Sequence, residues 1–69
     1  MMVEIYKFNA NFTNGLMKGL VMEQTMNFPS EECALDWVVR VNENNRNDNC
    51  DFWVSDLEYV EMKEIGQYA

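Results

Sequence analysis

The stretch NENNRNDNCD, residues 42–51, holds the side chains of this chain that come nearest to a metal-binding loop. Oxygen-bearing side chains alternate along it and recur at the twelfth position of the pattern: Asn45, Asn47, Asn49, Asp51 and Asp56. This spacing resembles that of an EF-hand calcium loop. However, the first ligand is not Asp, Cys50 replaces the central Gly, and the last ligand is Asp instead of Glu. Turn propensity explains the run better, so we expect no metal and no cofactor.

Nucleophilic catalysis is excluded in its common forms, because the chain has no histidine to pair with a serine or cysteine. Cys33 and Cys50 are predicted to be separated by about 18 Å of helix, so we expect two free thiols. Adjacent carboxylates occur at Glu31 and Glu32, but acid–base work also needs a concave pocket to shift their pKa values. A domain of this size seldom supplies one, and we expect no enzyme activity.

The charge balance is the strongest global clue. Twelve Asp and Glu face five Lys and Arg, which gives a net charge of −7 and a pI near 4.2. Nucleic-acid binding draws on clustered cations, so this composition argues against direct binding to nucleic acid. An acidic surface instead favours a protein partner with a basic surface, such as the groove of a nucleic-acid enzyme. The alternative is that acidity serves only solubility.

Residues 1–69 form a single domain by length alone. Alternating apolar residues predict a strand over residues 3–12, with Tyr6 and Phe8 on one face. The signal Thr13-Asn14-Gly15 predicts a turn and a second strand over residues 16–27. Of two candidate hairpin registers, we favour the one that pairs Phe8 with Leu20 and Tyr6 with Met22, because it buries more apolar side chains. Gly19 marks a candidate bulge.

Helix signals follow, with Ser30 as N-cap and acidic residues in the first turn. The spacing of Ala34, Trp37, Val38 and Val41 predicts a buried stripe on a helix over residues 31–45, which ends near Asn44 or Asn45. A third strand is expected over residues 52–62. Its apolar residues change from one face of the strand to the other along its length. A bulge near Ser55-Asp56 would account for this change. Residues 63–69 are expected to be a frayed tail.

These elements predict an α+β fold of β-β-α-β order. A mainly antiparallel sheet of three strands in the order 2-1-3 would carry one helix on one face. The other face would expose apolar and aromatic side chains, as partner-binding or dimer contacts: Val3, Ile5, Val21, Trp53 and Tyr59, with Leu57 as a further candidate. Such a face usually marks an interface with a second copy or another protein. Alternatively, the tail with Ile65 and Tyr68 folds back over it.

Two functional hypotheses follow. The first is a small acidic binding protein that inhibits or modulates a partner, with an acidic face of Glu31, Glu32, Asp56, Glu58 and Glu61. In size, acidity and minimal mixed fold, the chain resembles phage-encoded inhibitors of bacterial defence, including anti-CRISPR and anti-restriction proteins. That resemblance implies a nucleic-acid mimic. The second hypothesis is a structural homo-oligomer, with a homodimer as its simplest form. Without a secretory start or an apolar span, we expect a cytoplasmic protein (host cytoplasm if phage-encoded) and no membrane partner.

Overall fold

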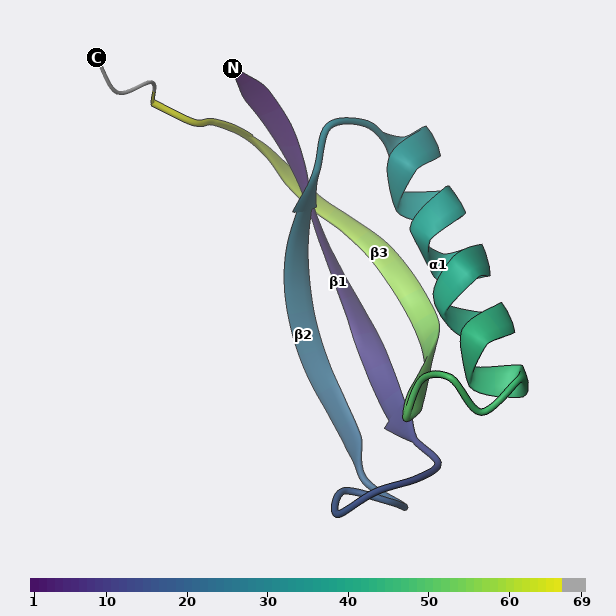
Figure 1. Ribbon diagram of the computed structural model, residues 1–69. Helices are drawn as coiled ribbons and strands as arrows, with labels where there is room; N and C mark the ends of the chain where they lie inside the picture. The colour runs from purple at the N-terminus through teal and green to yellow at the C-terminus, as the bar shows by residue number, and fades with distance from the viewer. Residues whose placement is uncertain (67–69) are drawn as a thin grey trace.

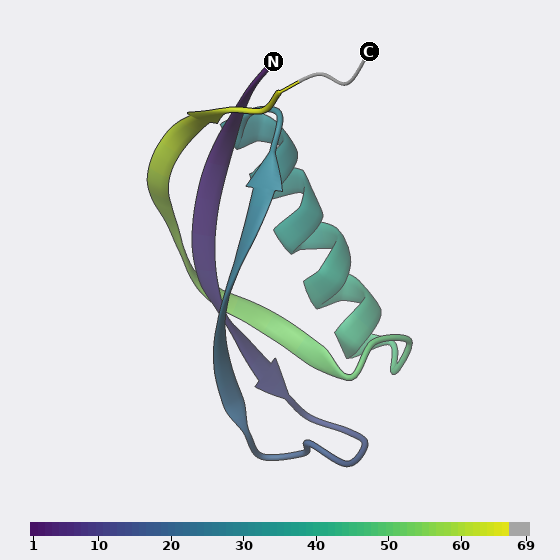
Figure 2. The same cartoon turned by 90° about the vertical axis from the view of Figure 1, so that its left-hand side faces the viewer.

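A computed structural model describes residues 1–66 and contains three strands and one helix: β1 (Met2–Phe12), β2 (Val21–Phe28), α1 (Glu31–Arg46) and β3 (Phe52–Glu64). The strands form one sheet in the order β2-β1-β3, with both pairs antiparallel. The helix lies along one face of this twisted sheet, which we call the helix face; the opposite face is the open face (Figures 1 and 2). The predicted α+β fold and strand order are confirmed.

The core lies between β1 and α1, where the predicted alternation and the predicted helical stripe meet. Tyr6, Phe8 and Ala10 of β1 are buried, and so is Ala34 of α1. The Trp37 ring packs at 5.0 Å from the Phe8 ring and 5.5 Å from the Phe28 ring, measured between centroids. Trp37 and Leu57 each contact both clusters of buried residues, so they join the two halves of the core.

The helix begins where its cap is predicted and ends slightly later. The Ser30 hydroxyl accepts a hydrogen bond from the Cys33 amide at 3.3 Å. The helix runs one residue beyond the predicted bound, and Asn47 caps it with a φ of −95°. The left-handed conformation expected at the helix end falls instead on Asp48, with a φ of 61°.

The predicted hairpin register is wrong. Phe8 pairs with Gln24 and Tyr6 with Met26, and the second strand begins at Val21. Residues 13–20 form a longer loop, because Gly15 and Gly19 both adopt positive φ and allow two successive turns. Backbone hydrogen bonds close this loop, while Leu16 and Leu20 stay exposed. These hydrogen bonds run from Lys18 N to Gly15 O, Leu20 N to Met17 O, Gly19 N to Phe12 O and Phe12 N to Leu20 O.

The predicted bulge in the third strand is confirmed. Asp56 has a φ of 58°, and the register between β1 and β3 shifts between the pairs Lys7–Glu58 and Asn9–Ser55. The extra residue reverses side-chain parity, which brings Leu57 onto the helix face beside the core. A second shift, which the sequence pattern did not predict, skips Val60 between the pairs Tyr6–Tyr59 and Ile5–Glu61.

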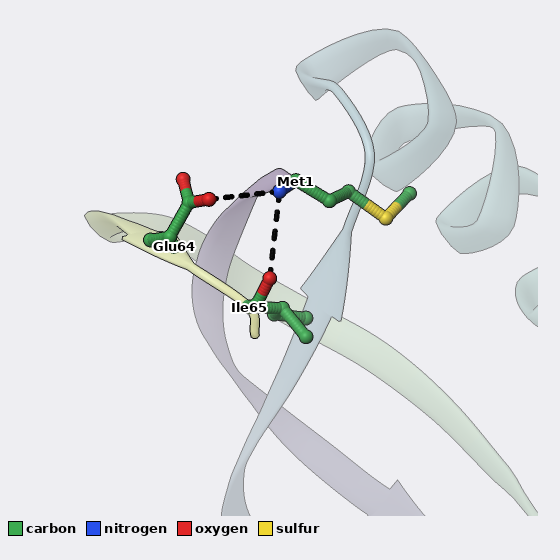
Figure 3. A network of polar contacts seen from close by, with 3 residues as sticks. All are labelled: Met1, Glu64 and Ile65. Atoms are coloured by element: carbon green, nitrogen blue, oxygen red, sulfur yellow. Dashed lines mark hydrogen bonds and ion pairs between the residues drawn. The ribbon is translucent and has the colours of Figure 1, made fainter. Parts of the chain in front are cut away.

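Residues 63–65 pair with the start of the chain where a frayed tail was expected. Lys63 and Glu64 belong to β3, and the Ile65 amide donates to the Met1 carbonyl oxygen at 2.7 Å. The Met1 amino group donates to Glu64 Oε1 at 2.9 Å and to the Ile65 carbonyl at 3.4 Å (Figure 3). Ile65 therefore continues the β1–β3 pairing and does not fold back over the open face. Tyr68 lies outside the described residues.

Within residues 1–66, no helix is both long enough and apolar enough to cross a membrane.

Candidate functional site

Three carboxylates of β3 lie along the open face: Asp56, Glu58 and Glu61, which we call the β3 carboxylates. Asp56 Oδ2 accepts hydrogen bonds from Asn9 Nδ2 at 3.0 Å and from the Ser55 hydroxyl at 3.1 Å. Glu58 Oε2 lies 3.4 Å from Lys7 Nζ. Glu61 pairs opposite Ile5 and makes no ion pair among the described residues. Two of these groups are thus positioned by neighbours on β1 or β3, while all three remain exposed to a partner.

Glu31 and Glu32 lie in a different layer from the β3 carboxylates. Both are exposed in the first turn of α1, at the end of the molecule where β1 begins and β3 ends (Figure 1). Because α1 covers the helix face and the β3 carboxylates lie on the open face, the two groups lie on opposite sides of the sheet. The five residues predicted as one acidic face therefore form two separate groups. The sequence shows that all five residues are acidic. Which face of the sheet the β3 carboxylates take depends on the bulge at Asp56.

A third acidic feature surrounds the buried phenol of Tyr6. Its hydroxyl donates a 2.6 Å hydrogen bond to Glu4 Oε1. This bond to the carboxylate raises the pKa of Tyr6 to about 12, with further contributions from burial and from the negative charges of Glu4 and Glu31. Sequence reasoning missed this cluster, although Glu4 and Tyr6 stand two residues apart on one strand face.

The Tyr6 hydroxyl gives the stability of the fold an alkaline limit. In the unfolded chain a tyrosine loses its proton near pH 10, whereas folded Tyr6 keeps it to about pH 12. The contribution of Tyr6 is therefore complete below pH 10 and is lost as the pH rises from about 10 to about 12. We expect urea unfolding midpoints to fall across this window, and to fall less steeply in Tyr6→Phe. Tyr59→Phe is the matched control, and equal slopes in all three proteins would contradict the assignment.

The apolar open face predicted from the sequence is not continuous. Val3 is buried, with 6% of its surface exposed, and Ile5 is half-buried, so neither offers a free contact. Strand alternation instead places Lys7, Asn9 and Asn11 along the middle of this face. The sheet twists and coils strongly where β1 and β3 extend past β2, and Val3 lies in that part (Figure 2).

Val21 and Trp53 remain exposed on the open face, but they do not touch across it. Both pair opposite Asn11, one from each neighbouring strand, so the asparagine lies between them. Tyr59 lies on the helix face because of the Asp56 bulge, and its ring packs edge-on against Tyr6 with 5.7 Å between centroids. The predicted apolar contact set is therefore divided between the two faces.

Trp53 instead lines a shallow, open hollow of about 380 Å³ beside the last turns of α1. The other lining residues are polar: Thr13, Asn42, Asn45 and Arg46. Asn45 Nδ2 donates to Thr13 Oγ1 at 2.7 Å and to the Cys50 carbonyl at 3.0 Å, so its amide is already used within the fold. The hollow offers an indole surface and one guanidinium, which suits contact with a protein surface better than enclosure of a small ligand.

The Asn42 side chain bonds to the backbone at the outer edge of β3, as a neighbouring strand would. The Val54 amide donates to Asn42 Oδ1 at 2.6 Å, and Asn42 Nδ2 donates to the Val54 carbonyl at 3.1 Å. One side-chain amide thus satisfies both outward backbone groups of Val54. The asparagine run that resembled a metal loop therefore ties the helix to the sheet. The available sequence signal is the i, i+3 spacing of Asn42 and Asn45, which places both on one side of the helix.

No group of three or more His, Cys, Asp or Glu able to hold a metal ion occurs within residues 1–66. Cys33 and Cys50 are free thiols, as expected.

Comparison of the chain with family models, curated proteins and solved structures found no match.

Proposed function

We propose that this protein binds a partner protein with a basic surface and inhibits or modulates it through the β3 carboxylates. The observation that carries the proposal is the state of its twelve carboxylates, all of which lie within residues 1–66. Three form ion pairs: Glu64 with the amino terminus, Glu58 with Lys7 and Asp36 with Arg40. The other nine have no cation within 4 Å among the described residues, so most of the negative charge is available to a partner.

The β3 carboxylates support this role better than the other acidic residues because neighbours hold two of them in place, Asp56 and Glu58, and the third, Glu61, lies beside them on the same strand. They project from a strand, and the hydrogen bonds of Asp56 restrict its side chain before a partner arrives. Less conformational entropy is then lost on binding. Complementary charge also speeds association and makes it dependent on salt. A basic channel that normally holds nucleic acid is one such partner surface, where these carboxylates would stand in for phosphates.

Neutralisation of two carboxylates tests the proposal directly. Glu58→Gln with Glu61→Gln changes the net charge from −7 to −5, and the control Glu43→Gln with Asp48→Asn makes the same change near the C-terminal end of the helix. Each protein is added to bacterial restriction and CRISPR nucleases cleaving a plasmid, at about 50 and 500 mM salt. We expect the β3 variant to need roughly tenfold more protein for the same inhibition at low salt.

The control should inhibit as the wild-type protein does. If both variants match the wild type at every salt concentration against an inhibited nuclease, contact through the β3 carboxylates is wrong. If the wild-type protein inhibits no nuclease in the panel, the nucleic-acid mimic form of the proposal is wrong.

A further inference from the structure

The two outer edges of the sheet differ in how they are protected. The edge of β3 is covered at Val54 by Asn42 and is interrupted by bulges at Asp56 and Val60. By contrast, β2 pairs with β1 without a register shift, contains no proline, lysine or arginine, and exposes seven of its eight residues. Exposed edges of this kind pair readily with another strand, and proteins usually block them. The bare edge of β2 is therefore an unblocked pairing surface.

The hydrogen bonds of the hairpin decide which backbone groups are free on this edge. Phe12 N donates to Leu20 O and Phe12 O accepts from Gly19 N, both at 2.9 Å, so both backbone groups of Phe12 face the second strand across a bulge at Gly19. Hydrogen-bonded and non-hydrogen-bonded pairs alternate along an antiparallel ladder. The even-numbered residues of β2 are thus bonded to β1, and the outward N–H and C=O groups belong to four odd-numbered residues: Val21, Glu23, Thr25 and Asn27.

We propose that this edge pairs with the same edge of a second copy, antiparallel, around a two-fold axis at Gln24. In this register all four outward residues are bonded: Val21 pairs opposite the partner's Asn27, and Glu23 opposite the partner's Thr25. On the helix face, Met22 lies opposite the partner's Met26. Both methionines are 37% exposed in one copy, because α1 lies towards β3 and covers only the Phe28 end of β2 (Figure 1). Pairing therefore joins apolar groups that have no other cover in the described fold.

The two neighbouring registers are less stable than the one centred on Gln24. Opposed residues must share a face, so the register shifts only in steps that keep this parity. One step in one direction places Glu23 opposite the partner's Glu23, and like charges directly opposite destabilise a sheet. One step in the other direction places Val21 opposite the partner's Pro29, which has no N–H to donate. The axis at Gln24 is the register that avoids both costs.

Charge opposes a second copy least at this edge. Glu23 is the one charged residue of β2, so two chains of net charge −7 meet where each carries least charge. The contact closes at two copies, because the outer edges of the resulting six-stranded sheet are the protected β3 strands. This dimer goes beyond the proposed function, and it leaves the β3 carboxylates free at both ends of the sheet.

Cysteine scanning across the axis tests the register. In a Cys33→Ser, Cys50→Ser background, single variants Glu23→Cys, Gln24→Cys and Thr25→Cys are oxidised under mild conditions. Gln24 and the partner's Gln24 would form a non-hydrogen-bonded pair, with Cα atoms about 4.5 Å apart, within disulfide range. We expect Q24C to form covalent dimers at least tenfold faster than E23C or T25C. Equal rates in the three variants would overturn the register.

Sedimentation equilibrium of the unmodified protein tests the dimer itself, with an expected mass of twice 8.2 kDa. Thr25→Pro removes an outward N–H without touching the bonds to β1, so it should raise the dimer dissociation constant roughly tenfold or more while the circular dichroism spectrum is kept. A mass of 8.2 kDa at every concentration up to about 1 mM would overturn the proposal, and so would a T25P variant that folds and dimerises as tightly as the wild type.

Discussion

Replacement of Trp37, a partly buried aromatic residue, by alanine should lower the free energy of unfolding by about 3 kcal/mol, the low end of the range for loss of a core aromatic side chain. Trp37 contacts both clusters of buried residues, and its ring packs against the rings of Phe8 and Phe28. No other side chain of α1 bridges the two clusters in this way. Because small domains have little stability in reserve, a loss of this size should leave much of the variant unfolded at 37 °C.

The second tryptophan provides a matched control. Trp53 is 42% exposed, on the open face at the start of β3, and belongs to neither cluster. Trp53→Ala should cost less than about 1 kcal/mol. Urea unfolding followed by far-ultraviolet circular dichroism compares the two variants without using tryptophan fluorescence. Equal destabilisation by the two substitutions would mean that Trp37 does not organise the core as described.

Replacement of Asn42 by leucine should have the next largest effect. It removes both hydrogen bonds to Val54 and leaves an edge amide and carbonyl of β3 without their partner, which costs about 1–3 kcal/mol. It also opens the protected edge of the sheet, so the variant should self-associate beyond the dimer proposed for the β2 edge. Urea unfolding and light scattering measure the two effects.

Asn44→Leu is the control for this prediction. Asn44 is exposed on the same helix, and its side chain makes no hydrogen bond among the described residues. The substitution adds an equal apolar volume without baring the β3 edge, so stability should change by less than about 0.5 kcal/mol. If Asn44→Leu and Asn42→Leu aggregate alike, added surface hydrophobicity and not the exposed edge is responsible.

Local sequence signals predicted the helix and the third strand well, because each signal there pointed to a single structural role. Ser30 capped the helix, Ala34 and Trp37 turned inward, and the parity change in β3 indicated its bulge at Asp56. The hairpin register failed because burial was weighed without the loop's own hydrogen bonds, which two glycines at positive φ made available. The sequence marks Gly19 only as a candidate bulge within the second strand, and residue type alone does not show that it closes a longer loop.

The sequence by itself determined the order of elements, the inward stripe of α1 and the excess of unpaired negative charge, because each depends on residue type and short-range spacing. Only the tertiary structure decided which acidic residues share a surface, since one bulge at Asp56 assigns Leu57 and Tyr59 to the helix face and Glu58 to the open face. It also decided that the asparagine run closes the β3 edge through Asn42 while β2 stays bare. The order of the strands could be predicted, but which edge is covered depends on the contact between Asn42 of α1 and Val54 of β3, which only the folded chain shows.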